Sequence, residues 1–207
     1  KRHSASMQEI LIKAAEQYIK TGVSVIPTDN NKRSVIQWKQ YQEKKMTIAE
    51  ISKNFTITSC AGVALICGKV SGNLEVIDID LKNDTKGDMY QNIIDNIPEE
   101  IMKKLRVVKT KSGGYHFYYR CQKISGNQKF ASRPATAEEL KASPLVSQVV
   151  LIESRGEGGY VIAPPTDGYL TISESKEIQS ITPEERDVII EICRSFNEVH
   201  ELAKYTP

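Results

Sequence analysis

The sequence has little cysteine, and its cysteines form no recognisable motif. Its four cysteines, Cys60, Cys67, Cys121 and Cys193, are scattered, with no Cys-x-x-Cys spacing and no Cys/His cluster. This spacing argues against a structural zinc site and against the disulfide framework of a small secreted protein. We therefore expect no zinc in this segment and a reducing, cytoplasmic environment.

Long apolar runs, a signal-peptide pattern and a large net charge are also absent. Nothing in the sequence is apolar over a length that could span a bilayer, so we expect no membrane partner. The 28 Lys and Arg residues nearly balance the 26 Asp and Glu residues, which gives a net charge of +2. Any nucleic-acid partner must therefore be bound by local basic patches rather than by the overall charge.

The apolar residues that are present follow the patterns of helices and strands in a globular protein. With 207 residues, of which 40% are hydrophobic, the chain can bury a core as one domain or two small ones. Their spacing predicts a helix over residues 8–20 and a strand over residues 23–27. Thr47 and Glu50 indicate a capping box at the start of a short helix that ends at residue 54.

Strand patterns dominate the second half of the sequence. After a buried strand at residues 61–67, short β-rich strands are predicted at residues 106–110, 115–121, 149–153, 160–163 and 169–172. Helices are predicted across residues 89–104 and from residue 183 to about residue 200. Residues 122–148 are polar and are predicted to be an insertion with one helix near residues 137–141.

The most informative pattern is an apolar strand that ends in two carboxylates. Side chains in residues 74–80 alternate between faces, so Asp78 and Asp80 point one way while Ile77 and Ile79 point the other. Two like charges this close repel, and a divalent cation such as Mg²⁺ or Mn²⁺ is the common compensation where phosphate chemistry occurs. The alternative is an edge strand that frays into an acidic loop.

A second group of polar residues surrounds a glycine pair in the turn before residues 115–121. Glycines allow backbone N–H groups to approach an anion closely, and the neighbouring side chains add charge and hydrogen-bond donors. The candidate phosphate-binding residues are Lys109, Lys111, Ser112, Gly113, Gly114 and His116. The alternative is an ordinary hairpin with a half-buried histidine.

A third pattern places Glu153 and Arg155 at the end of the strand predicted from residue 149. A carboxylate that closes a buried strand would complete a two-metal site on the paired aspartates. Because Arg155 lies two residues further along, its guanidinium would face the same side, where a triphosphate needs neutralising. Glu157 competes for the same ligand role, and its alternative is a solvated hairpin tip.

Aromatic and basic residues also gather at residues 38–45. Trp38 and Tyr41 could stack on bases of a single strand, and Lys44 and Lys45 could follow its phosphates. The alternatives are core packing for Trp38 and a solvated face for the two lysines.

Taken together and in this order, these strings resemble the Prim-Pol domain of the archaeo-eukaryotic primase superfamily, found in plasmids, phages, mobile elements and some CRISPR loci. The resemblance covers most of the chain, and it includes residues 22–27, 32–38, 62–68, 71–80, 109–119 and 153–165. By position, it assigns the catalytic roles to Asp78, Asp80, His116 and Glu153, with the three carboxylates as metal ligands. The sequence departs from the family pattern twice: many relatives have Asp where Glu153 stands, and many have Ser at the position of Gly114.

The resemblance implies a DNA primase and DNA polymerase core that performs template-dependent nucleotidyl transfer with two Mg²⁺ or Mn²⁺ ions. The expected partners are a single-stranded DNA template and primer and dNTP or rNTP, with possible fused helicase, zinc-binding or CRISPR adaptation partners outside this segment. The implied fold is α/β (α+β). Its parts are a smaller N-terminal α/β subdomain at 1–70, an RRM-like mixed sheet at 71–173 that carries the catalytic site, and a C-terminal helical segment at 174–207.

Two other function classes stay open at this point. A metal-dependent nuclease would use the same carboxylates to activate water. A non-catalytic single-stranded nucleic-acid-binding module of the RRM type would carry aromatic residues on its central strands, where this sequence has Asp78 and Asp80.

Overall fold

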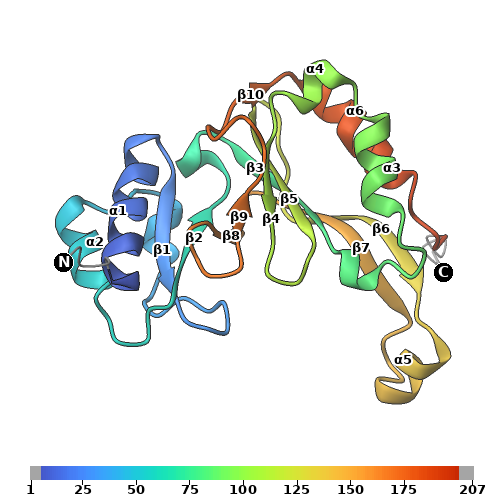
Figure 1. Ribbon diagram of the computed structural model, residues 1–207, viewed down its shortest axis with the longest axis horizontal. Helices are drawn as coiled ribbons and strands as arrows, with labels where there is room; N and C mark the ends of the chain where they lie inside the picture. Colours follow the sequence, from blue (N-terminus) through green and yellow to red (C-terminus); the bar gives the residue numbers. More distant parts are fainter. Residues whose placement is uncertain (1–5, 201–207) are drawn as a thin grey trace, which may run out of the picture.

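The N-terminal lobe is built from two helices whose starts follow the predicted capping signals. In this computed structural model, which describes residues 6–200, helix α1 spans Met7–Lys20 and helix α2 spans Ile48–Asn54. The capping box predicted from Thr47 and Glu50 is present, because each residue binds the backbone N–H of the other. Both helices pack on the small sheet of this lobe (Figure 1).

The small sheet takes one strand from a distant part of the chain. Strands β1 (Ser24–Thr28), β2 (Gly62–Ile66) and β8 (Tyr160–Ala163) pair antiparallel in the order β1-β2-β8. Because β8 lies within the range predicted for the catalytic subdomain, the N-terminal lobe is completed by residues far beyond the predicted boundary at residue 70. The chain therefore passes from the N-terminal lobe into a second lobe, built around a large sheet, and returns to the first lobe at β8.

The large sheet has seven strands within the described residues, in the order β6-β7-β3-β5-β4-β9, with β10 paired in parallel to β5. The strands are β3 (Leu74–Ile79), β4 (Arg106–Lys109), β5 (Tyr115–Cys121), β6 (Gln128–Pro134), β7 (Gln148–Arg155), β9 (Leu170–Thr171) and β10 (Ser180–Ile181). The central strands β3, β4, β5 and β7, numbered 1 to 4 along the chain, lie in the order 4-1-3-2 and are antiparallel to their neighbours. This arrangement, with helices between β3 and β4, matches the predicted RRM-like mixed sheet.

Both faces of the large sheet are covered, and each belongs to a different core. Helices α3 (Met89–Asn96), α4 (Glu99–Met102) and α6 (Pro183–Arg194) cover one face, where Ile77 and Phe117 are buried (Figure 1). Val76 and Tyr118, on the opposite face, join the core of the N-terminal lobe. The alternation of side chains along β3 and β5 therefore decides which lobe each residue contacts.

Short 3₁₀ turns connect several strands. They are η1 (Lys39–Gln42), η2 (Lys69–Ser71) and η3 (Leu81–Asn83). The last of these turns begins immediately after Asp80. None of the helices described within residues 6–200 has the length and apolar character needed to cross a membrane.

Two predictions for the second half of the chain are wrong in part. Residues 122–148 contain the helix predicted near 137–141, α5 (Ala137–Ala142), but they also contain β6, an edge strand paired with β7. The polar composition concealed this strand because only its middle is buried. Helix α6 ends at Arg194 and does not reach residue 200, because the following residues turn back to β6: the Glu198 N–H donates to the Ser132 carbonyl.

Candidate active site

Three predicted site residues lie side by side across the middle of the large sheet. Asp78 on β3 is paired with His116 on β5 and with Glu153 on β7. Directly opposed residues of antiparallel strands project from the same face, so these three side chains point to one side. Asp80 follows two residues after Asp78 and emerges on that side as β3 ends. Because β3 is a central strand, the alternative of a fraying edge strand is wrong.

His116 is held almost completely inside the protein next to Asp78. Its Nε2 atom lies 3.4 Å from Oδ1 of Asp78, and the histidine is 6% exposed. Burial would raise the pKa of the Asp78 carboxyl, but the hydrogen bond to His116 and the charge of Arg155 outweigh this and lower the pKa. The ionised form of Asp78 is therefore stabilised even without a metal.

In Asp80 and Glu153 the pKa shifts in the opposite direction to that of Asp78. Burial raises the pKa of Asp80 and of Glu153, and the negative charge of Asp78 raises both further, against the attraction of Lys82 and Arg155. Nη2 of Arg155 lies 2.5 Å from Oε1 of Glu153, whereas Nζ of Lys82 lies 3.6 Å from Oδ2 of Asp80. Oδ1 of Asp80 is buried and has no hydrogen-bond partner in the described part of the chain.

These residues line a cleft of about 490 Å³ between the two lobes. The large sheet and its turns contribute the carboxylates, His116, Arg155 and Ser112, while the N-terminal lobe contributes Trp38 on the opposite wall. The ring of Trp38 packs edge-on against Tyr160, with 5.1 Å between ring centroids. The cleft therefore combines a negative floor with basic and aromatic walls.

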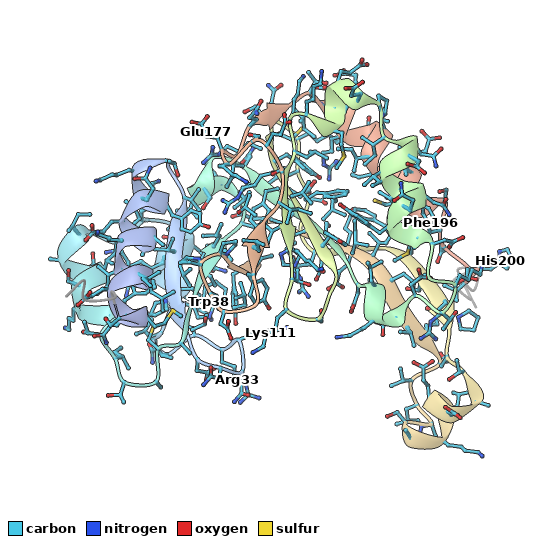
Figure 2. All side chains as sticks on the ribbon, viewed as in Figure 1. Arg33, Trp38, Lys111, Glu177, Phe196 and His200 are labelled. Carbon is cyan, nitrogen blue, oxygen red and sulfur yellow. The ribbon has the colours of Figure 1, made fainter. Side chains whose placement is uncertain are left out.

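The other predicted phosphate-binding residues do not line this cleft. Lys109 is paired with Tyr115, so it projects from the opposite face to His116, and it is exposed there. Lys111 is exposed in the turn, and Figure 2 shows it on the same lower side of the view as Trp38 and Arg33. Gly113 has a φ of +91°, and a Cβ atom added there would meet no neighbour.

Gly114 has a packing role that explains why serine does not stand there. A Cβ atom at this position would lie 2.3 Å from the carbonyl oxygen of Ile79 on β3. Real Cβ atoms do not approach backbone oxygens so closely, so only glycine fits beside β3 here. The turn therefore packs directly against the strand that carries Asp78 and Asp80.

The expectation that Tyr41 offers its ring to a nucleic-acid strand is wrong for this structure. Tyr41 is 3% exposed, and its hydroxyl donates a hydrogen bond of 2.5 Å to Glu50. Lys44 and Lys45 are exposed but do not line the cleft, and Nζ of Lys45 donates to the Val70 carbonyl. Of the four predicted nucleic-acid contacts, Trp38 alone is a cleft residue.

Several cleft residues were not predicted as site residues, although three of them lie in stretches that carry the family resemblance. They are Lys32, Lys82, Thr110, Asn127, Tyr160 and Tyr169. Lys32 belongs to a polar turn that the sequence shows only as a loop, yet it has a φ of +65° and its carbonyl accepts a hydrogen bond from the Tyr160 hydroxyl. The contact between this loop and β8 brings a lysine from the N-terminal lobe to the carboxylates.

Within residues 6–200, no group of three or more His, Cys, Asp or Glu side chains already converges as a metal-ligand set. Glu157, the predicted competitor of Glu153, lies outside the cleft and accepts a hydrogen bond of 2.7 Å from the Lys69 N–H. This leaves Asp78, Asp80 and Glu153 as the carboxylates of the cleft.

Comparison with protein families identifies one matching family across most of the chain. Residues 15–185 match the model of the N-terminal domain of bifunctional DNA primase/polymerases, the Prim-Pol domain. The matched region contains every residue of the cleft described above. A search of curated individual proteins gives no match. The chain belongs to the Prim-Pol family, as the resemblance in its sequence predicted.

Proposed function

We propose that this member of the bifunctional DNA primase/polymerase family performs template-dependent nucleotidyl transfer in the cleft between its two lobes. The observation that carries the proposal is the row formed by Glu153, Asp78 and His116, with Asp80 beside it. Carboxylates face basic side chains from both lobes in one cleft. An incoming nucleotide presents phosphates, and a site for phosphate chemistry requires this combination of charges.

In this proposal the carboxylates of the cleft would bind two divalent cations, Mg²⁺ or Mn²⁺. Asp80 has a buried oxygen without a partner among the described residues, and the pKa values of Asp80 and Glu153 are raised because burial and the charge of Asp78 oppose their ionisation. A cation bound between these side chains would remove both penalties, and carboxylate oxygens are the ligands that such ions prefer. Asp78, Asp80 and Glu153 would hold the ions, with waters and substrate oxygens as further ligands.

When bound, the cations would supply charge that lowers the pKa of a primer 3′-hydroxyl and neutralises the phosphates of the incoming nucleotide. The side chains of this protein then have positioning roles. His116, fixed beside Asp78, presents an imidazole to the cleft, and its buried Nδ1 has no partner among the described residues. The hydroxyl of Ser112, 3.4 Å from that of Thr110, lines the same wall.

Basic residues on opposite walls would hold the triphosphate. Arg155 now forms an ion pair with Glu153, and a metal at that carboxylate would free the guanidinium for a bidentate contact with a phosphate. Lys32 approaches from the N-terminal lobe, so a bound triphosphate would connect the two lobes. Trp38, on the same lobe, offers an aromatic ring against which a base of the nucleotide or the template could stack.

Primer extension with purified protein tests the proposal. The wild type should add labelled dNTP or rNTP to a primer annealed to a single-stranded template in the presence of Mn²⁺ or Mg²⁺. The double variant Asp78→Asn/Asp80→Asn should lose this activity by at least about a hundredfold, since it removes two of three metal-binding carboxylates. Asp187→Asn, which changes an exposed acid on α6, is the matched control and should retain full activity.

The same experiment distinguishes the two other function classes. A nuclease would shorten the labelled strand without added nucleotides, and its products would also depend on Asp78 and Asp80. A binding module would retain the strand without changing its length. Undiminished extension by the double variant would refute the assignment of the active site.

A further inference from the structure

A second pocket lies at the junction of the two lobes, away from the catalytic cleft. It has a volume of about 680 Å³ and is lined by α1, by the end of β8 and by the segment that precedes β10. We call it the junction pocket. Figure 2 shows Glu177, which lines the junction pocket, at the opposite end of the lobe junction from Trp38, which lines the cleft.

Basic side chains that have no carboxylate partner in the described part of the chain line the junction pocket. Arg106, Arg120 and Lys176 all contribute to its wall, and none of them forms an ion pair with an acidic residue described in the structure. Glu177 is the single acid of the lining, and it is exposed. Three positive charges against one exposed negative charge leave an unbalanced positive potential in the pocket.

Arg106 is the central residue because it is almost completely buried and only partly bonded. It is 6% exposed, and its Nη2 atom donates to the hydroxyls of Tyr18 at 2.8 Å and Thr171 at 3.1 Å. An arginine has five N–H donors, and no hydrogen bond from Nε or Nη1 is formed to any described residue. Nε is a buried donor of a charged group that has no partner among the described residues, which costs free energy, and Nη1 makes no hydrogen bond to them, so Arg106 has donor capacity left for an anion.

The surroundings hold the guanidinium of Arg106 in place. Its Cζ lies 5.4 Å from the ring centroid of Tyr18 and 5.1 Å from that of Tyr118. The Tyr18 hydroxyl in turn donates to the Pro164 carbonyl at 2.7 Å. A fixed, planar guanidinium loses little conformational freedom when it binds a planar or tetrahedral anion in bidentate fashion.

Arg120 and Lys176 add positive charge while they are anchored to the backbone. The three nitrogens of Arg120 donate to the carbonyls of Ser71, Ile178 and Thr21, and Nζ of Lys176 donates to the Ser173 carbonyl. These carbonyl groups accept the hydrogen bonds of the two side chains but carry no net charge, so they do not neutralise the positive charges. Burial lowers the pKa of Arg120, which agrees with a guanidinium that has no counter-ion among residues 6–200.

We propose that the junction pocket binds a phosphate group, either as free phosphate or as part of a nucleotide, through Arg106 with support from Arg120 and Lys176. Its volume lies within the range of small-molecule sites. The tyrosine and proline side chains along the wall offer an apolar surface for a base or a sugar. The proposal does not depend on nucleotidyl transfer in the cleft.

Calorimetric titration of the whole chain with sodium phosphate tests the proposal, in chelator and at constant ionic strength set with sodium chloride. The wild type should show saturable binding, and Arg106→Met should weaken it by about tenfold or more, since a charge-assisted hydrogen bond is lost. Lys53→Gln removes one exposed charge from α2 and should bind like the wild type. In chelator Arg155 stays paired with Glu153, so Arg155→Gln tests whether the measured binding is at the cleft, and binding at the junction pocket should be retained.

A second variant and a second ligand complete the test. Lys176→Gln changes an exposed side chain, so it should fold normally and still weaken binding. A nucleoside monophosphate should bind at least as tightly as phosphate, whereas the nucleoside without phosphate should not bind. The proposal is overturned if the wild type shows no heat beyond the chloride control, if Lys176→Gln and Arg106→Met both bind like the wild type, or if Arg155→Gln removes the binding.

Discussion

Replacing Asp80 by Asn should stabilise the metal-free protein and abolish most of its stabilisation by Mn²⁺. Without a cation, Asp80 faces the negative charge of Asp78 and has a buried oxygen without a partner among the described residues. Asn has nearly the same shape and no charge, so the substitution removes the repulsion. With Mn²⁺ present, the same substitution removes a ligand. The sign of its effect on stability should therefore reverse.

The size of the stabilisation by Asp80→Asn follows from the distance between the charges of Asp78 and Asp80. Side chains two residues apart on a strand are separated by about 7 Å, and two unit charges at that distance repel by about 2.4 kcal/mol at an effective dielectric constant near 20. The side chain of Asp80 is 28% exposed, so solvent and salt reduce this to about 1 kcal/mol. Losing the attraction of the exposed Lys82 offsets part of the gain. For a chain of this size, the melting temperature should rise by about 2 °C.

Metal binding should act in the opposite direction and more strongly. At a concentration of one hundred times the dissociation constant, Mn²⁺ should stabilise the wild type by about 2.7 kcal/mol, which is about 5–10 °C. Asp80→Asn should lose most of this shift. The assay is thermal unfolding followed by circular dichroism, in EDTA and across a MnCl₂ titration.

Two controls make the prediction specific. Asp78→Asn should destabilise the protein in EDTA, because the pKa of Asp78 is lowered by His116 and its ionised form therefore contributes to stability. Asp187→Asn should leave the melting temperature unchanged both in EDTA and in MnCl₂. The reasoning is refuted if Asp80→Asn and Asp78→Asn shift the melting temperature in the same direction in EDTA, or if Mn²⁺ stabilises Asp80→Asn as much as the wild type.

Three further predictions concern the fold and the cleft. Glu75→Gln should lower the unfolding free energy by about 3–5 kcal/mol, because it leaves the buried Arg186 without its 2.7 Å ion pair. A fall in melting temperature of under about 3 °C would contradict this prediction. Trp38→Ala should reduce primer extension while leaving Mn²⁺ stabilisation unchanged, and loss of the metal response would argue against a role in holding nucleotide or template. The hydrogen bond to Arg133 and the N–H of the helix cap lower the pKa of Glu139 from 4.5 to about 2, so its stabilising effect is present above pH 4.5 and is lost between about pH 4.5 and pH 2. The difference in melting temperature between the wild type and Glu139→Gln should therefore shrink across that interval, and a constant difference would exclude this ion pair as its source.

Local patterns in the sequence were sufficient wherever a few neighbouring residues decide the structure. The capping box at Thr47 depends on residues three apart, and it is present. The alternation that places Asp78 and Asp80 on one face depends only on the two-residue period of a strand. Family membership was likewise carried by short strings, and it was confirmed over residues 15–185.

Long-range pairing decided the rest of the site, and no local pattern encodes it. The register that sets His116 and Glu153 opposite Asp78 joins strands separated by dozens of residues. The hydrogen bond from the Tyr160 hydroxyl to the Lys32 carbonyl spans 128 positions and helps to hold that lysine beside the cleft.

The sequence by itself determined that this protein has a strand ending in two carboxylates, a glycine turn beside a histidine, and the family to which these belong. Only the tertiary structure decided which charges are balanced. Within the described residues, it gave Asp78 the partner His116, left an oxygen of Asp80 unpaired, and buried Arg106 without a carboxylate partner. The reason is physical: hydrogen bonding and strand period act between near neighbours, whereas burial and charge compensation depend on what the fold brings together from distant positions.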